Sequence, residues 1–217
     1  MKRSERYARV LEWFEINMPV AETELDYETP YGLLVAVVLS AQCTDKRVNL
    51  VTPALLERFP NPLSMSEATP EEIFPFISSV TFPNNKSRHL AGLARELVNR
   101  YDSIVPDNPD ELQKLPGVGR KSANVIASVI YGKPLIAVDT HVFRVSRRIG
   151  LSEGEDVLKV EEDLTNNIPR EKRSIAHHWL ILHGRYVCVA RKPKCTSCGL
   201  SAFCKFYEDT LKKSCSQ

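Results

Sequence analysis

Apolar residues recur at helical spacing along almost the whole chain. Side chains three or four positions apart share one face of an α-helix, and an apolar stripe of this kind packs against a core. Each segment that carries such a stripe is therefore expected to form a helix that buries it. The stripes are Tyr7, Val10, Leu11 and Phe14; Val48, Val51, Leu55 and Phe59; Leu90, Leu93, Leu97 and Tyr101; Val125, Ile126, Val129 and Ile130; Val142, Val145 and Ile149; and Val157, Val160 and Leu164.

Residues that favour the start of a helix add to the evidence from these stripes. Residues 29–30 and 69–70 both read Thr-Pro, which places a capping side chain before a proline at the first helical position. Glu71 and Glu72 then add negative charge to the first turn of the second helix. The one extended candidate, residues 135–138, is four residues long and is expected to be a connection. The pattern predicts an all-α fold of about ten short helices.

The composition excludes several classes of protein. Hydrophobic residues make up 43% and charged residues 26% of the 217 positions, as in an ordinary folded protein. The longest uncharged stretch, residues 29–44, is shorter than the roughly 20 apolar residues that a membrane helix needs. The N-terminal segment mixes charged and apolar residues and has no export-signal pattern. We expect a cytoplasmic monomer with no membrane partner.

Charge is distributed unevenly along the chain. Residues 1–110 hold 11 Lys and Arg against 16 Asp and Glu, whereas residues 111–217 hold 18 against 11. Between residues 112 and 150 the only acid is Asp139, in a stretch with seven basic residues. This excess suits a polyanion, although a charge run alone is often only a solvated surface. The basic residues are Lys114, Arg120, Lys121, Lys133, Arg144, Arg147 and Arg148.

Residues 115–121 read Leu-Pro-Gly-Val-Gly-Arg-Lys and lie between two helical segments. Gly117 and Gly119 allow a tight turn and a close approach of the backbone to a ligand. Amides at the start of the following helix, with Arg120 beside them, are suited to bind a phosphate. The alternative is an ordinary helix–helix turn without a ligand. The flanking basic residues favour the phosphate.

Residues 115–125, followed by Val-Asp-Thr-His-Val-Phe-Arg-Val at 138–145, resemble the helix-hairpin-helix and Gly/Pro-Asp segment of the endonuclease III family of DNA glycosylases. The resemblance extends over residues 33–204. It implies base excision repair on double-stranded DNA that contains a damaged base or an abasic site. A protein with that substrate is expected to associate with the nucleoid.

The resemblance also implies two all-α domains with a DNA-binding cleft between them. Residues 24–133 would form a six-helix bundle that carries the hairpin. Residues 1–23 and 134–217 would form a discontinuous domain around an iron–sulfur cluster.

Lys121 directly follows the expected phosphate-binding turn. By resemblance its amine displaces the base from C1′, forms a Schiff base and permits β-elimination of the 3′ phosphate. An ordinary lysine, with a pKa of about 10.4, is protonated at neutral pH, so its surroundings must favour the neutral amine. Arg120 and partial burial would act in that direction. Taken alone, Lys121 would more often be a phosphate contact.

Asp139 stands just before a helical stripe, where an aspartate is commonly a simple N-cap. In the resembling family this aspartate assists deprotonation and stabilises the developing sugar cation. We expect both roles together, since a cap position orients the carboxylate. His141 is expected to be structural or a phosphate contact.

The four cysteines Cys188, Cys195, Cys198 and Cys204 have the spacing C-x6-C-x2-C-x5-C, which is typical of a metal-binding loop. Disulfides are disfavoured without an export signal. Structural zinc sites usually show two close cysteine pairs, and here only one pair is close, so zinc is the weaker alternative. Four thiolates suit a [4Fe–4S] cluster, and the spacing resembles the endonuclease III cluster loop.

Arg191, Lys192 and Lys194 lie between the first two cysteines, and no acid occurs from residue 185 to 207. We expect the cluster to shape this loop for contact with DNA phosphates, without a redox step in catalysis. Cys43 and Cys215 fall outside the spacing; the first is expected to be a small buried residue and the second part of the tail.

An enzyme that acts on a base in duplex DNA must flip the nucleotide out and fill the gap. By resemblance, Gln42 and Phe82 are the wedge residues. The alternatives are a helix-end polar residue and an aromatic packed on the core. The family commonly has glycine, leucine and tyrosine in place of Thr81, Phe82 and Pro83, so the wedge here is bulkier and its loop stiffer.

These features predict a bifunctional DNA glycosylase and apurinic/apyrimidinic lyase that removes oxidised pyrimidines. One rival is a monofunctional mismatch glycosylase of the same superfamily, which usually lacks a lysine at the place of Lys121. The other is a non-catalytic helix-hairpin-helix module that only binds DNA. Such a module would keep the glycines and the basic surface but would not need Lys121 and Asp139 together.

Overall fold

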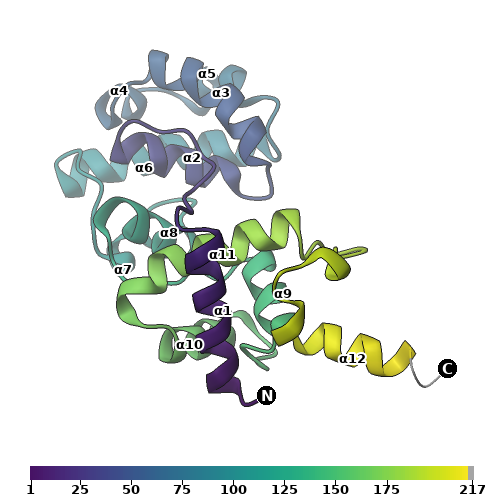
Figure 1. Cartoon of the computed structure of the whole chain (residues 1–217). Helices are drawn as coiled ribbons and strands as arrows, with labels where there is room; N and C mark the ends of the chain where they lie inside the picture. The colour runs from purple at the N-terminus through teal and green to yellow at the C-terminus, as the bar shows by residue number, and fades with distance from the viewer. Residues whose placement is uncertain (215–217) are drawn as a thin grey trace. The chain divides into compact units, whose positions relative to one another are not determined.

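The computed structural model describes residues 1–214, with side chains through residue 211, and its regular elements there are all helices (Figure 1). The predicted all-α fold is confirmed. The chain divides into two compact units, one made of Met1–Glu22 with Lys133–Gln217 and one of Thr23–Gly132. No helix in the described part is both long and apolar enough to cross a membrane.

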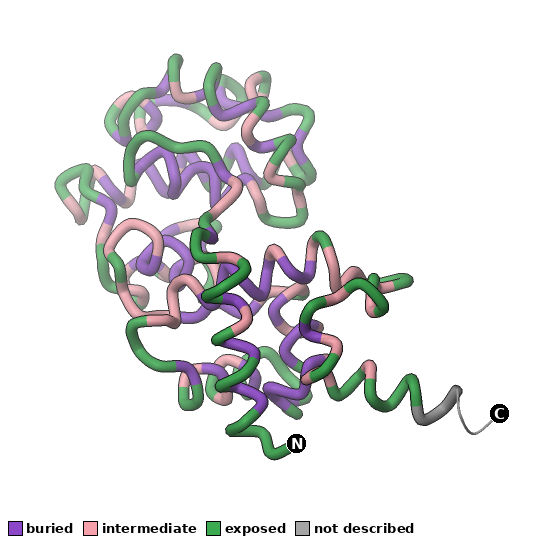
Figure 2. Tube along the Cα trace, in the orientation of Figure 1, coloured by how far each residue is buried: buried purple, intermediate pink, exposed green. Residues whose placement is uncertain are grey.

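The unit Thr23–Gly132 is built around a central apolar helix. Residues 31–39 of that helix, α2, are all buried, and its tube in Figure 2 is purple over most of its length. A helix that is apolar on every side needs cover on every side. Helices α3, α6 and α8 pack against α2, while α4 and α5 pack against α6. The helices are α2 (Pro30–Ser40), α3 (Asp45–Arg58), α4 (Pro62–Ser66), α5 (Pro70–Ile77), α6 (Pro83–Tyr101), α7 (Pro109–Leu112) and α8 (Arg120–Tyr131).

Both predicted Thr-Pro starts are confirmed in this unit. The Thr29 hydroxyl accepts a hydrogen bond from the Gly32 amide at 3.0 Å, at the start of α2. Thr69 and Glu72 form a reciprocal capping box at the start of α5. The stripes predicted within α3 and α6 supply buried leucines and valines to the core. Local caps and apolar spacing therefore determine where these helices begin and which side they bury.

The other unit joins the two ends of the chain in one core. Phe14 of α1 stacks on Trp179 of α11 with ring centroids 5.5 Å apart. The Trp179 indole donates to the Met18 carbonyl at 2.7 Å, and the Tyr7 hydroxyl donates to the Leu151 carbonyl at 2.9 Å. These contacts hold the N-terminal helix against segments more than 140 positions later. The helices are α1 (Arg3–Asn17), α9 (Thr140–Ile149), α10 (Val157–Asn167), α11 (Arg173–Tyr186) and α12 (Lys205–Ser214).

Three short 3-10 turns complete the same unit: η1 (Arg170–Lys172), η2 (Cys195–Ser197) and η3 (Ser201–Phe203). The segment between α8 and α9 contains no strand, so residues 135–138 form a connection as predicted. The turns η2 and η3 carry the chain through the cysteine-rich segment, where regular helix is replaced by loop.

Candidate active site and DNA-binding loops

The hairpin between α7 and α8 needs glycine for two different reasons. Gly117 has a φ of 82°, and a Cβ at this position would come within 3.0 Å of His89. Gly119 is the N-cap of α8, has no capping side chain, and leaves open space where a Cβ would stand. The first glycine therefore makes the turn, and the second exposes the N-terminus of α8, where helix amides and dipole favour an anion.

The hairpin is anchored on the core of its unit. Leu115 and Val118 are buried, and the Val118 amide donates to the Leu115 carbonyl at 3.1 Å. Pro116 packs so closely on Gly92 of α6 that a Cβ there would lie 3.3 Å from the proline ring. The turn therefore presents its glycines from a rigid support.

Lys121 and Arg120 occupy the first turn of α8. Arg120 is exposed and Lys121 is half-buried. Residues 123–128 of α8, directly after this first turn, are all buried in the core of the unit, which holds the helix in place. The backbone of Lys121 thus lies two residues beyond the open cap at Gly119.

Asp139 belongs to the other unit, where it caps α9. One of its carboxylate oxygens accepts from the amides of His141 and Val142, each at 2.8 Å. These two bonds to the start of a helix hold the half-buried carboxylate in one orientation. The N-cap expected from the sequence is therefore present.

Next to this cap, His141 contacts an arginine that connects three elements. Arg144 Nη2 lies 3.2 Å from His141 Nδ1 and donates to the Gly184 carbonyl of α11 at 2.9 Å. Arg144 Nε donates to the Cys188 carbonyl at 3.1 Å. The arrangement matches the structural role considered for His141.

The four predicted ligand cysteines line one pocket of their unit. Residues from α9, α11 and α12 complete its wall, among them Ile149, His183 and Phe206. Among the described residues, no three Cys, His, Asp or Glu side chains converge closely enough to form a ready-made site for a metal ion. The four thiols therefore surround a common space without closing on a single point. They are Cys188, Cys195, Cys198 and Cys204.

The electrostatics of this pocket disfavour free thiolates. Burial raises the pKa values of Cys195, Cys198 and Cys204, and negative charge on the neighbouring sulfurs raises each of them further. A bound cationic centre would reverse this effect, because metal ligation deprotonates a thiol. The donor set and its surroundings thus fit a metal centre that binds all four sulfurs.

Two side chains that sequence reasoning missed contact the sulfurs. Arg148 Nη1 lies 3.6 Å from Cys188 Sγ and also donates to the Val189 carbonyl at 2.8 Å. His183 Nε2 lies 3.6 Å from Cys198 Sγ, and burial lowers the pKa of this histidine to about 4, so its ring is neutral at pH 7. In the sequence, Arg148 is only one of the basic residues between 112 and 150, and His183 follows an apolar run; neither signal indicates contact with a sulfur.

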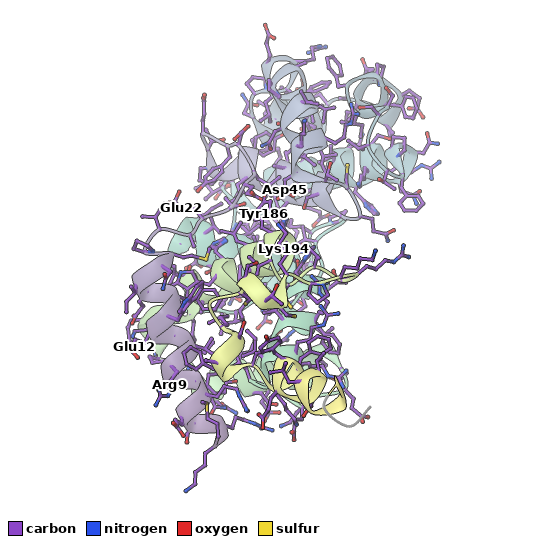
Figure 3. The ribbon with its side chains drawn as sticks, turned by 45° about the vertical axis from the view of Figure 1, so that its right-hand side comes forward. Arg9, Glu12, Glu22, Asp45, Tyr186 and Lys194 are labelled. Carbon is purple, nitrogen blue, oxygen red and sulfur yellow. The ribbon has the colours of Figure 1, made fainter. Side chains whose placement is uncertain are left out.

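The basic side chains of the loop are exposed. Arg191, Lys192 and Lys194 all face solvent, and Lys192 has a φ of 53°. Lys194, which Figure 3 labels, immediately precedes the turn η2. The loop therefore presents three positive charges beside the cysteine pocket. Cys43 is half-buried rather than fully buried as expected, and Cys215 lies outside the described residues.

Both predicted wedge residues have left-handed backbone conformations. Gln42 follows α2 with a φ of 54°, and Phe82 caps α6 with a φ of 56°. Gln42 is exposed, and Phe82 has 56% of its surface exposed. Phe82 is therefore not an aromatic packed on the core, which was the alternative interpretation.

The contacts of two further residues near the predicted wedge residues, Thr81 and Lys86, were not predicted from the sequence. Thr81 Oγ1 donates to the Gln42 carbonyl at 2.8 Å. Lys86 is only 4% exposed and donates from Nζ to the carbonyls of Leu39 and Ala41. The available signal for Lys86 was its place on the apolar stripe of α6, four positions before Leu90.

Comparisons with known proteins agree with the fold. The family model of the HhH-GPD superfamily of base excision DNA repair proteins matches residues 35–170. An endonuclease III of Rickettsia prowazekii is 45% identical over 203 residues, which cover 94% of this chain and 96% of the relative. The endonuclease III of Escherichia coli K12 is 42% identical over 207 residues, covering 95% and 96%.

A solved structure of a trapped endonuclease III–DNA covalent intermediate, an estranged-adenine complex, is 44% identical to this chain. It superimposes with a TM-score of 0.92 and covers 97% of this chain and 100% of its own. The chain belongs to the HhH-GPD superfamily of base excision DNA repair proteins. Within that superfamily it is a member of the endonuclease III family, whose members are DNA glycosylases and AP lyases.

Proposed function

We propose that this enzyme excises oxidised pyrimidines from double-stranded DNA and cuts the strand through a covalent intermediate on Lys121. The observation that carries the proposal is the position of Lys121 in the first turn of α8, directly after a glycine turn with an open helix N-terminus. A phosphate bound at that N-terminus would set the distance between the amine and the neighbouring sugar. A related endonuclease III has been trapped covalently on DNA.

In the proposed reaction, the neutral Lys121 amine attacks C1′ of the damaged nucleotide, and the bond to the base breaks. The base leaves with the bonding electrons and takes up a proton. Loss of the amine proton and opening of the sugar produce a Schiff base. Removal of a C2′ proton then expels the 3′ phosphate by β-elimination, and water releases the enzyme.

Asp139 is proposed to assist the proton transfers and to stabilise positive charge on the sugar. Its two bonds to the α9 amides support this role because they orient the carboxylate without consuming both of its oxygens. A group held in this way loses little entropy when it acts on a substrate.

The proposed DNA contacts come from four loops. Gly117, Gly119 and Arg120 would bind a backbone phosphate at the hairpin, and the exposed basic residues of the cysteine loop would bind others. Gln42 and Phe82 would fill the space of the flipped nucleotide. Action on chromosomal DNA also leads us to propose that the enzyme works at the bacterial nucleoid.

We propose a [4Fe–4S] cluster as the cofactor of the cysteine pocket. Cys188, Cys195, Cys198 and Cys204 line one pocket and would hold such a cluster through their four thiolates, whereas structural zinc sites usually draw on two close cysteine pairs. When bound, the cluster supplies a rigid cross-link for the loop. Purified protein should therefore be brown and contain about four iron atoms per chain; a colourless, zinc-containing protein would refute this cofactor.

The deciding experiment is borohydride trapping on a duplex with one thymine glycol. Borohydride reduces a Schiff base to a stable adduct, so wild-type enzyme should become covalently attached to the damaged strand. Lys121→Gln should still bind the duplex but form no adduct, and its strand cleavage should fall by at least about a thousand-fold, since it lacks the nucleophile. Lys159→Gln, at an exposed lysine of α10 paired with Glu162, is the matched control and should react normally.

The outcomes also separate the rival functions. An alkali-labile site without an adduct would indicate a monofunctional glycosylase. Binding without any reaction, on thymine glycol and on an abasic duplex alike, would indicate a DNA-binding module. An adduct formed by Lys121→Gln would remove this lysine from the proposed role.

A further inference from the structure

Gln42 and Phe82 share an unusual backbone feature. Both are non-glycine residues with positive φ, at 54° and 56°. Such a conformation is unfavourable for a residue with a side chain and persists only where surrounding contacts impose it. Both lie in the same unit, so the contacts that impose these conformations can be read directly from it.

One contact joins the two loops directly. The Thr81 hydroxyl donates to the Gln42 carbonyl at 2.8 Å, across 39 positions of sequence. Thr81 immediately precedes Phe82, so this bond ties the backbone of Gln42 to the residue before Phe82. A glycine at position 81, which is common in the resembling family, has no side chain with which to form it.

A second contact fixes the base of the Gln42 loop. Lys86 reaches from the first turn of α6 to the end of α2, where its ammonium donates to the carbonyls of Leu39 at 2.7 Å and Ala41 at 2.8 Å. Its own amide donates to the Phe82 carbonyl at 3.1 Å. A positive charge at a helix C-terminus also interacts favourably with the helix dipole. Lys86 therefore touches the backbone next to both wedge residues.

We propose that Thr81 and Lys86 are positioning residues that hold Gln42 and Phe82 as one preassembled wedge. This inference rests on the proposed function. Lys86 sets the end of α2, and Thr81 ties the Gln42 carbonyl to the residue that precedes Phe82. The wedge then enters the duplex as a unit, with little ordering of the loops at the moment of binding. Thr81 can be substituted without disturbing the core, because it lies on the surface.

The test measures the affinity for a duplex that contains a tetrahydrofuran abasic analogue, which cannot form a Schiff base. Thr81→Val keeps the shape and loses the donor, and its dissociation constant should rise about three-fold or more, as expected for one hydrogen bond. Thr81→Ser keeps the donor and should stay within about two-fold of wild type. Thr165→Val on α10 is the matched control and should bind like wild type.

A double-mutant cycle makes the test specific to positioning. In the wild-type background, the effects of Gln42→Ala and Phe82→Ala should be non-additive, because each loss disturbs a wedge that acts as a unit. In the Thr81→Val background the two effects should become additive. A merely structural role for Thr81 would weaken binding without changing this coupling.

The outcomes separate the inference from the function on which it rests. Wild-type binding by Thr81→Val, or equal coupling in both backgrounds, would overturn the inference alone. If neither Gln42→Ala nor Phe82→Ala weakens binding, the proposed wedge itself is wrong, and the inference is overturned with it.

Discussion

The wedge loops, residues 40–43 and 80–83, and the cysteine loop, residues 188–204, both carry proposed DNA contacts. Different interactions hold these loops in place. Residues 40–43 and 80–83 are fixed by protein hydrogen bonds, from Thr81 and from the buried ammonium of Lys86. Residues 188–204 contain only the short turns η2 and η3 around a pocket lined by four thiols. The wedge loops are therefore held by hydrogen bonds within the polypeptide, whereas the cysteine loop is proposed to be held by a cluster that binds its four sulfurs.

The largest effect should follow from removing one of the proposed cluster ligands in the cysteine loop. Cys198→Ser removes one of four sulfurs, and the protein should lose its brown colour and most of its iron. Metal ligation of small domains is worth on the order of 10 kcal/mol, so the unit that carries the loop should also unfold at much lower urea concentration. Absorbance, iron content and urea denaturation measure these changes.

Cys43→Ser is the matched control, because Cys43 lies outside the pocket in the other unit. It should retain full iron content. Full iron in Cys198→Ser, or loss of iron in Cys43→Ser, would contradict the assignment of the ligands.

A smaller effect is expected from breaking the wedge support. Lys86→Met keeps most of the apolar stem but leaves the buried carbonyls of Leu39 and Ala41 without their charged donor. The free energy of unfolding should fall by about 2–4 kcal/mol, with iron content unchanged. Urea denaturation measures the loss, and Lys46→Met at an exposed position should change stability by less than about 0.5 kcal/mol.

The pH dependence of the same variant provides a second check. Burial lowers the pKa of Lys86 below its ordinary value of 10.5. At pH values between the lowered pKa of Lys86 in the folded protein and its ordinary pKa of 10.5, the unfolded chain binds more protons than the folded one. In that window Lys86 therefore makes the free energy of unfolding rise with pH. Lys86→Met should lack this contribution; an unchanged profile would show that Lys86 is not responsible for it.

The smallest effect on stability is expected at Asp139, which caps the helix that carries Arg144 and Arg148 to the cysteine loop. Asp139→Ala removes two amide bonds and should cost about 1 kcal/mol. Asp139→Asn retains a good cap and should keep the stability, while cleavage of the damaged strand still falls. Thermal unfolding and single-turnover cleavage separate the two roles; normal cleavage by Asp139→Asn would limit Asp139 to capping.

Much of the fold was predictable because it depends on local rules. The stripe at Leu90, Leu93 and Leu97 has the spacing of a helix face and is buried as such. The Thr-Pro pair at residues 69–70 begins a helix with the expected capping box. Cap and spacing act over a few residues, so the sequence contains all that is needed to recognise them.

The candidate site was predictable only in part. Gly117 was recognised because positive φ favours glycine, and the structure places it there at 82°. Lys86 lies on the line of an apolar stripe, four positions before Leu90, but nothing in the sequence indicates which carbonyls it would meet. Those carbonyls belong to a helix about 45 positions earlier, and packing alone brings them within hydrogen-bond distance.

The sequence by itself determined the helices, the glycine turn, the cap at Asp139 and the set of four cysteines, because each depends on neighbours or on a fixed spacing. The tertiary structure decided which distant groups support them. The tie between Thr81 and Gln42, the buried charge of Lys86 and the contact of His183 with Cys198 all join segments that are far apart in the chain or on different elements. Such contacts form only when a packed core fixes the distance between elements, so no local pattern encodes them.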